Sequence, residues 1–432
     1  MASVKIAVIG GGSAYTAGLI DSFVQVAGDL AGSEIVLMDI DPGHLSIIER
    51  LGRRMIEAAG ADLILRTTLN RREAIQDADF VLIQFRIGGL PARRLDEHLP
   101  LKYGIIGQET VGPGGMFMAL RTIPVVLEIA QEMKRLAPRG LLINYTNPTG
   151  IVTEALHRYS DVRMLGLCDE IYGIRRIMGQ VLGVEAARIV IYAYGLNHAS
   201  WGRHLWVDGK EAMAELQSRI PFVSREDFPD SKSWSVIRLF KLYGFIANRY
   251  LRYYYFHDEM LEEARQAPLS RAEEILASLP EIFASYEEQS RQPLPHLVKR
   301  RGTGAHGDLA VRVINAIAND QPEVYLVNVV NRGAVSNLPP DSIVEVPARV
   351  GREGVFPLVM GPLPGEVAGL VQSLKSYELQ VVEAAITGSR SQALKAMLSN
   401  PLVQSVGRAE KLLDEMLAAH KEYLPQFRAA GG

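Results

Sequence analysis

Short, uninterrupted apolar segments that alternate with helix-like periodicity are the feature that most constrains the fold of this 432-residue chain. The first segment, Val4–Ile9, stops at a glycine, and residues with helical spacing follow over Ala17–Ala27. Further strand candidates are Glu34–Asp39, Asp79–Ile83, Leu141–Asn144 and Arg163–Leu167. Strands that are apolar on both faces and separated by helices, such as the one at Ala119–Leu136, predict a parallel sheet covered on both sides. Ligands bind such sheets at the carboxyl ends of the strands.

The alternation breaks down between Arg86 and Pro113, where glycines and charged residues replace it. We therefore predict a long irregular connection there, and such connections often carry function. After about residue 195 the periodicity changes again, through segments at Ser224–Ser233 (polar), Tyr250–Phe256 (aromatic) and Gly407–Tyr423 (amphipathic). This change predicts a second domain, which a chain of this length has room to build.

Composition excludes several classes of partner. The net charge is −3, so there is no electrostatic reason to expect nucleic acid or an anionic membrane as partner. Three glycines interrupt the N-terminal apolar run, which argues against a signal helix, and no uncharged apolar stretch of eighteen residues could span a bilayer. With one cysteine the chain has no disulfide framework, so a reducing cytoplasm is the expected location.

Gly10-Gly11-Gly12-Ser13 follows the first strand and precedes a helix, as in a dinucleotide-binding turn. The G-x-G-x-x-G fingerprint is imperfect, because its third glycine position holds Tyr15. Asp39 ends the second strand, where an acid accepts the ribose hydroxyls and repels a 2′-phosphate. These residues predict an NAD site. The alternative is a structural glycine turn beside a solvated aspartate.

Two polar segments are ambiguous on their own. Asn147 precedes a proline, which favours an extended backbone and an amide that faces the crevice, but Asn-Pro is also a common turn. Glu109 stands in Gly107-Gln108-Glu109-Thr110, within the predicted irregular connection. Alone, that segment indicates a solvated loop.

The sole cysteine and the aromatic segment are also ambiguous. Cys168, taken alone, is most simply a small buried hydrophobe, yet a thiol binds a metal when a histidine such as His198 joins it. Tyrosines spaced as in Tyr250-Leu251-Arg252-Tyr253-Tyr254 are more often core or interface residues than catalysts. A tyrosine acts as a base only if its pKa falls well below ~10, which requires a nearby cation or metal.

Taken in order, these segments resemble glycoside hydrolase family four, the NAD- and metal-dependent glycosidases. The resemblance runs from about Lys5 to Tyr423. Besides the glycine turn and the tyrosine segment it includes Pro100–Gly104, Gly107–Thr110, Asn147-Pro148, Gly166–Cys168 and Gly195–His198. It implies an α/β fold of lactate/malate dehydrogenase-like architecture. In this fold a Rossmann-type, doubly wound parallel sheet over residues 1–194 precedes a mixed α+β domain over residues 195–432, which binds substrate and metal and forms oligomer contacts.

The resemblance implies a redox route to glycosidic cleavage, an exception to the two-carboxylate scheme. NAD takes a hydride from sugar C3, the ketone acidifies the C2 proton, a base removes that proton, and the C1 leaving group is eliminated. Water then adds and NADH returns the hydride. The family's Mn²⁺ ligands match Cys168 and His198, its base matches Tyr250, and Asp169 is the candidate acid for the leaving oxygen.

The resemblance also bears on the substrate, with two conflicting signals. Asp169 matches some 6-phospho-α-glucosidases, whereas the longer matches resemble 6-phospho-β-glucosidases: Arg86–Leu90, Gly112–Gly115, 297–302 and Asn337–Pro339. We give the longer matches more weight and expect 6-phospho-β-glucosides. An alternative is another sugar, a 6-phospho-α-glucoside or an unphosphorylated α-glycoside.

Four further residues occupy substrate-binding positions of the family: Arg93, Glu109, Asn147 and Arg271. The two arginines are candidates for the phosphate, since a guanidinium holds phosphate with two parallel hydrogen bonds. His98 stands where relatives often have another basic residue. Family members are commonly homodimers or homotetramers, and we expect the same here.

Two other functions stay open at this point. A simple NAD-dependent 2-hydroxy acid dehydrogenase would share the Rossmann half and leave Cys168 and His198 as core residues. A catalytically dead NAD-sensing or assembly protein is disfavoured by the intact set of Cys168, His198 and Tyr250.

Overall fold

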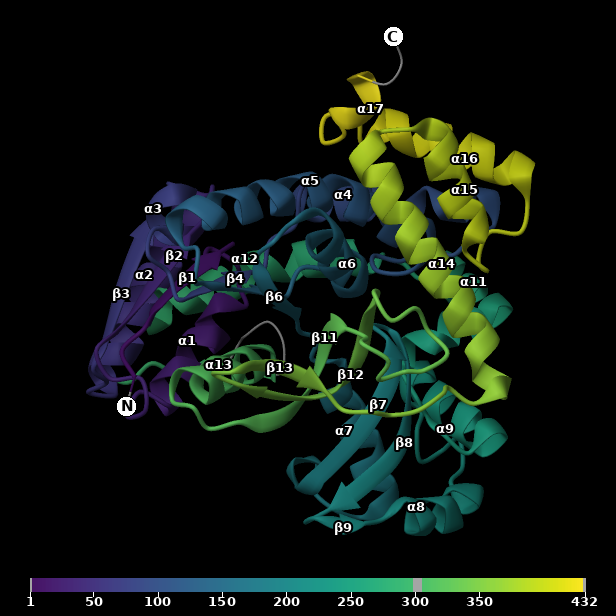
Figure 1. Cartoon of the computed structure of the whole chain (residues 1–432), viewed down its shortest axis with the longest axis horizontal. Helices are drawn as coiled ribbons and strands as arrows, with labels where there is room; N and C mark the ends of the chain where they lie inside the picture. The colour runs from purple at the N-terminus through teal and green to yellow at the C-terminus, as the bar shows by residue number, and fades with distance from the viewer. Residues whose placement is uncertain (1, 298–304, 430–432) are drawn as a thin grey trace.

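The computed structural model of the chain describes residues 2–297 and 305–429, and within them one sheet of thirteen strands organises the molecule (Figure 1). Its main path runs β3-β2-β1-β4-β5-β6-β11-β12-β7-β8-β10, with β13 paired to β12 and β9 to β8. The strands are β1 (Lys5–Ile9), β2 (Ser33–Met38), β3 (Leu63–Thr68), β4 (Phe80–Ile83), β5 (Leu141–Asn144), β6 (Arg163–Gly166), β7 (Ile189–Leu196), β8 (Ala199–Val207), β9 (Lys210–Glu211), β10 (Ile246–Ala247), β11 (Glu323–Val330), β12 (Ile343–Gly351) and β13 (Gly354–Pro357).

The first six strands pair in parallel and confirm the predicted Rossmann-type half. The five strands predicted from apolar runs are all present. The strand that sequence reasoning missed is β3, whose residues alternate between buried and exposed in its first half. As the edge strand it carries Arg66 and Thr67 in place of a continuous apolar run, and so it lacks the signal of a buried strand.

The second half of the chain extends the same sheet with antiparallel strands. The junction is a single register pair, Asn328 of β11 beside Gly166 of β6, after which β12, β7, β8 and β10 follow antiparallel. The expected domain boundary at residues 194 and 195 falls inside β7. Strands β11 and β12 lie between β6 and β7 in the sheet, so the junction joins segments that are far apart in the chain.

The helices cover both faces of this sheet (Figure 1). They are α1 (Thr16–Gln25), α2 (Pro42–Ala58), α3 (Arg71–Ile75), α4 (Gly89–His98), α5 (Gly112–Leu136), α6 (Thr149–Tyr159), α7 (Glu170–Leu182), α8 (Met213–Arg219), α9 (Ser231–Tyr243), α10 (Arg252–Tyr255), α11 (His257–Gln266), α12 (Arg271–Gln289), α13 (Ala305–Ala318), α14 (Gly365–Thr387), α15 (Arg390–Ser399), α16 (Val406–Ala419) and α17 (Gln426–Ala429). Short 3₁₀ turns are η1 (Pro100–Tyr103), η2 (Ala186–Arg188), η3 (Ile220–Phe222) and η4 (Arg249–Leu251). Apolar side chains from α14, α15 and α16 pack on α5 in one cluster.

The prediction of a long irregular connection between Arg86 and Pro113 was wrong. Helix α4 and turn η1 occupy most of it, and Gly112 is the first residue of α5. The buried face of α4 consists of Ala92, Arg93, Asp96 and Glu97, so the helix has no apolar periodicity to detect. The free-energy cost of burying those charges is offset by ion pairs, which form only in the folded chain.

Helix α5 is long and apolar enough to cross a membrane by length and composition alone. It carries Arg121 and Glu128, and 78% of its most apolar stretch of 18 residues is buried inside the fold. A buried core helix meets the same criteria, so this helix is weak evidence for a membrane segment. Residues 298–302 of the motif noted above lie outside the described residues.

Candidate active site

A cavity of about 830 Å³ opens at the carboxyl ends of the parallel strands. The glycine turn after β1 lines one end, and Cys168, Asp169 and Tyr250 line the other. Of the residues predicted for the site, all except Gly11 and His198 contribute to its wall. The cavity is thus large enough for a dinucleotide and a small substrate to lie side by side.

The glycine turn packs too closely for side chains. A Cβ at Gly10 would lie 2.8 Å from the Gln84 carbonyl oxygen, and one at Gly11 would lie 2.7 Å from the Cβ of Leu37. Gly10 also has φ +94°, a conformation that glycine adopts without strain. The turn therefore brings its backbone close to the cavity, as pyrophosphate binding requires.

Asp39 is held by the same turn. Its Oδ2 accepts the Gly12 N–H at 2.8 Å, and its Oδ1 accepts the N–H groups of Ile40 and Asp41 at 2.8 and 3.1 Å. A Cβ at Gly12 would lie 3.0 Å from the Asp39 carboxyl carbon. These contacts place a fixed negative charge at the end of β2, beside the cavity.

Cys168 and His198 meet although thirty residues separate them. Cys168 follows β6, whereas Asn197 and His198 form the two-residue connection between β7 and β8. The Cys168 Sγ lies 3.5 Å from the His198 Nε2. His198 has φ +63°, a left-handed backbone that costs a histidine on the order of 1 kcal/mol and is typical of functional positions.

Burial sets the protonation of both groups. The His198 side chain is buried, and this lowers its pKa to about 3, so the imidazole is neutral and able to ligate a metal. Burial, with Glu345 next in effect, raises the pKa of the Cys168 thiol. A metal cation would have the opposite effect, because it binds the thiolate.

Within the described residues, no group of three or more His, Cys, Asp or Glu side chains is placed to hold a metal. Two bonds of about 2.1 and 2.3 Å that meet at roughly 105° span about 3.5 Å, the length expected between a nitrogen and a sulfur ligand of one ion. The Cys168–His198 separation therefore fits a divalent metal with two protein ligands. The remaining coordination positions would be free for substrate or water.

Tyr250 covers the imidazole of His198. The two rings stack with centroids 3.9 Å apart and an interplanar angle of 20°. The Tyr250 N–H donates to the Asn248 Oδ1 at 3.0 Å, which secures the start of η4. Burial, followed by the negative charge of Glu170, raises the pKa of Tyr250 well above its ordinary value. Without a cation on the Cys168–His198 pair, this hydroxyl stays protonated.

Asp169 precedes the first turn of α7 and lines the cavity beside Cys168. Burial raises the pKa of its carboxyl, while the Arg249 guanidinium acts in the opposite direction. A raised pKa favours the protonated carboxyl that a general acid needs.

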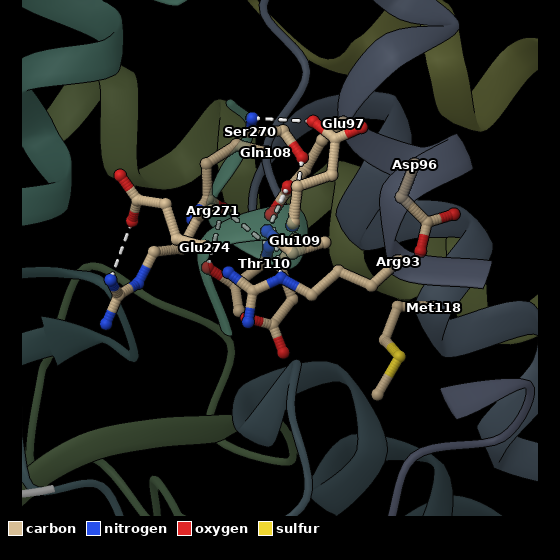
Figure 2. Close-up of polar contacts among 12 residues, drawn as sticks. Arg93, Asp96, Glu97, Gln108, Glu109, Thr110, Met118, Ser270, Arg271 and Glu274 are labelled. Carbon is tan, nitrogen blue, oxygen red and sulfur yellow. Dashed lines mark hydrogen bonds and ion pairs between the residues drawn. The ribbon is translucent and has the colours of Figure 1, made fainter. Parts of the chain in front are cut away.

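Arg93, predicted to bind substrate or phosphate, is buried between two carboxylates (Figure 2). Its Nε donates to Glu97 Oε1 at 2.7 Å, and its Nη1 lies 2.7 Å from Glu109 Oε2. Arg86 also pairs with Glu109, and the Ala272 N–H donates to Glu97 at 2.8 Å. The predicted solvated loop at Glu109 is therefore a buried ion-pair cluster. Sequence reasoning missed Arg86 because no local pattern links it to Glu109. Arg93 and Glu97 are an i,i+4 pair, but that spacing indicates an ion pair only in a helix, and no helix was predicted here.

Arg271 lies apart from this cluster, in the first turn of α12 (Figure 2). Its side chain is 64% exposed at the cavity wall and pairs with Glu274 at 2.7 Å. His98 and Arg94 both contact Glu273, and the Arg94 side chain is exposed, as expected of a surface arginine. Arg271 is thus the predicted phosphate cation with the greater freedom to reach a ligand.

Asn147 lines the cavity after β5, next to the cis peptide bond with Pro148. Its Oδ1 accepts a hydrogen bond from the Thr149 hydroxyl at 3.3 Å. The amide nitrogen is on the same side chain, so Asn147 has a donor to offer a sugar hydroxyl.

Sequence reasoning missed a buried polar network behind the metal pair. Glu345 of β12 accepts hydrogen bonds from Asn197 Nδ2 at 2.9 Å and from Ser200 Oγ at 2.7 Å. The Asn248 Nδ2 donates to the same Ser200 hydroxyl at 3.4 Å. This network joins the His198 turn to the Tyr250 segment. A polar residue within the apolar strand at Val344–Val346 is the one signal that could have pointed to it.

Comparison with known proteins agrees with this geometry. Residues 5–184 match the family model described as family 4 glycosyl hydrolase, and residues 193–403 match the model of that family's C-terminal domain. The chain is 43% identical to a probable 6-phospho-beta-glucosidase of Bacillus subtilis strain 168, with 98% of each chain covered.

Two solved structures match across nearly the whole length. One is the 6-phospho-beta glucosidase from Thermotoga maritima with manganese, NAD⁺ and glucose-6-phosphate: TM-score 0.86, 30% identity, 97% of this chain and 99% of that chain. The other is a 6-phospho-alpha-glucosidase from gut microorganisms in complex with NAD and Mn²⁺: TM-score 0.88, 30% identity, 98% of this chain and 99% of that chain.

Proposed function

The chain belongs to glycosyl hydrolase family 4, and from this premise we propose that it hydrolyses the O-glycosidic bond of 6-phospho-β-glucosides with NAD and a divalent metal, Mn²⁺ foremost. The observation that carries the proposal is the Cys168–His198 pair, 3.5 Å apart, with the Tyr250 ring stacked on the imidazole. Cys168 and Tyr250 line the same cavity as the glycine turn, so cofactor and sugar would share one space.

The chemistry divides between the bound groups and the chain. When bound, NAD accepts and returns a hydride, and the metal polarises the sugar C2 and C3 oxygens and supplies the positive charge near Tyr250. Tyr250 takes the C2 proton as base, and Asp169 gives a proton to the leaving oxygen as acid. The buried setting that raises the pKa of Asp169 supports the second role.

The substrate contacts follow from the charges along the cavity. We assign the 6-phosphate to Arg271, whose guanidinium is mostly exposed, with Arg93 contributing from behind its two carboxylates. Glu109 and Asn147 then face the sugar hydroxyls. Gly10, Gly11, Gly12, Ser13 and Asp39 hold the NAD.

The expected assembly, location and domain division follow from the same premise. We propose a homodimer or homotetramer in the cytoplasm that acts on a small sugar phosphate, without nucleic acid or membrane as partner. The net charge of −3 and the single cysteine support this. We propose a division into an NAD-binding part, 1–194, and a substrate part, 195–432; the second family model begins at residue 193, close to this boundary.

A kinetic panel tests the proposal. Purified protein is assayed with p-nitrophenyl α- and β-glucosides and galactosides, with and without a 6-phosphate, in the presence of NAD and Mn²⁺. We expect turnover of the 6-phospho-β-glucoside, loss of turnover with EDTA, recovery with Mn²⁺ and no net accumulation of NADH. Turnover of the α-anomer alone would show that Asp169, and not the longer matches, indicates the substrate.

The 2-hydroxy acid dehydrogenase alternative predicts a different result in the same panel. It would produce NADH in proportion to the substrate consumed and would be indifferent to EDTA. The full-length family match and the adjacent Cys168 and His198 favour the glycosidase.

A further inference from the structure

Arg249 stands next to Tyr250 in the sequence but does not share its place in the cavity wall. Among the described residues, the cavity wall includes Tyr250 and Asp169 but not Arg249. The Arg249 guanidinium instead forms two parallel bonds with Glu170, Nε to Oε1 at 2.5 Å and Nη2 to Oε2 at 2.7 Å. The side chains of Arg249 and Glu170 are 29% and 9% exposed, so this ion pair is largely shielded from water.

Because Gly173 has no side chain, the Arg249 guanidinium has room to pack against α7 at this position. Gly173 stands inside α7, where glycine costs roughly 1 kcal/mol relative to alanine. A Cβ at this position would overlap the Arg249 guanidinium, with Nη1 only 2.6 Å away. The obstructing atoms belong to the far end of a flexible side chain, so an added methyl would displace the guanidinium and leave the helix intact.

The ion pair joins two segments that carry proposed catalytic groups. Glu170 is the first residue of α7 and directly follows Asp169, whereas Arg249 opens the turn η4 that presents Tyr250. On its other side, η4 is attached to the sheet through Asn248, whose Oδ1 accepts the Tyr250 N–H and whose N–H donates to the Ser200 carbonyl at 3.0 Å. The Tyr250 segment is therefore fixed from two directions.

We propose that Arg249, seated on Gly173 and paired with Glu170, is a positioning residue that sets the Tyr250 hydroxyl relative to Asp169 and to the His198 ring. This inference rests on the proposed function, because it assigns Tyr250 the role of base. The planar guanidinium holds Glu170 through two parallel bonds, a geometry that a lysine cannot reproduce. Misplacement of a reacting group by about 1 Å costs roughly 100-fold in rate, so a small shift of η4 has a large effect.

Three variants test the inference. Gly173→Ala keeps every polar group and displaces the guanidinium, while Arg249→Lys keeps the charge but forms only one bond. The matched control is Gly369→Ala, an exposed glycine in α14 with no atom within 4 Å of the added Cβ. Each variant is assayed with NAD and Mn²⁺ on p-nitrophenyl 6-phospho-β-glucoside and on its C2- and C3-deuterated forms.

We expect kcat of Gly173→Ala and of Arg249→Lys to fall about 10- to 100-fold, with KM changed less than about threefold. The C2 isotope effect should rise, because proton removal becomes slower, while the C3 isotope effect should not. Equilibrium affinities for NAD and Mn²⁺ should stay within about threefold of the parent protein. The double variant should lose little more than either single variant, because both act on one contact.

Other outcomes overturn the inference. Full activity of Gly173→Ala would show that the guanidinium position does not matter. A parallel loss of thermal stability, NAD affinity and both isotope effects would show a purely structural ion pair. An inactive parent protein on this substrate would refute the proposed function, whereas an active parent with unaffected variants would refute the positioning role alone.

Discussion

The buried carboxyl of Glu345 should make the stability of the protein depend on pH, and the size of this effect follows from the structure. Glu345 is 3% exposed and accepts hydrogen bonds from Asn197 and Ser200. Burial raises its pKa from 4.5 to about 7, against the opposite effect of those two donors. The folded protein therefore holds a proton that the unfolded chain releases between about pH 4.5 and 7.

The sign follows from which state binds the proton. Between those two pH values the folded state binds more protons, so the free energy of unfolding falls as pH rises. At 1.36 kcal/mol per pH unit, the full cost of ionising Glu345 is roughly 3 kcal/mol. The stabilisation is complete below about pH 4.5 and is lost above about pH 7.

Glu345→Gln removes this dependence while it preserves the shape of the side chain. We expect the variant to gain roughly 2.5 kcal/mol relative to the parent protein between pH 5 and pH 8. Urea unfolding of the metal-free proteins across this range measures the difference, and other ionisable groups cancel in it. Glu353→Gln, at a side chain 78% exposed, is the control and should give a flat difference. A flat difference for Glu345→Gln as well, within about 0.5 kcal/mol, would refute the reasoning.

Three further predictions concern the metal pair, the base and the core. Cys168→Ser should weaken Mn²⁺ binding about tenfold or more in direct titration and retain a native circular dichroism spectrum, whereas loss of the fold would make Cys168 a core residue. Tyr250→Phe should slow exchange of the sugar C2 proton with deuterated solvent by about 100-fold or more, as followed by NMR, and unchanged exchange would remove Tyr250 from the base role. Arg121→Met should destabilise the fold by about 3 to 5 kcal/mol in denaturant titration, because Asp96, 0% exposed, loses its two-bond partner. A loss below about 1 kcal/mol would contradict that estimate.

The parallel half of the sheet is readable from local pattern. Strands β1, β2, β4, β5 and β6 consist mainly of consecutive apolar residues. Such a run is visible in the sequence whatever the tertiary structure. Edge strand β3 and helix α4 were missed for a shared reason. Both elements contain charged residues at positions that are buried or paired in the fold. In the sequence, a charged residue looks exposed unless its ion-pair partner is known.

The motifs and their order along the chain determined which family this protein resembles. They also determined which side chains are candidates for the active site. Cys168, His198, Tyr250 and the glycine turn could be singled out without coordinates, as could Asp169. These are local facts, set by covalent order and by the turns and strands that short segments form.

Tertiary structure alone decided which of these groups touch. It placed Cys168 against His198 and closed Arg93 between Glu97 and Glu109, which turned a predicted phosphate cation into the centre of an ion-pair cluster. It also laid Arg249 on Gly173, a contact between residues 76 positions apart in the sequence. Such contacts depend on where the ends of strands β6, β7 and β8 lie in the folded sheet, and long-range packing of this kind leaves no periodic pattern in the sequence.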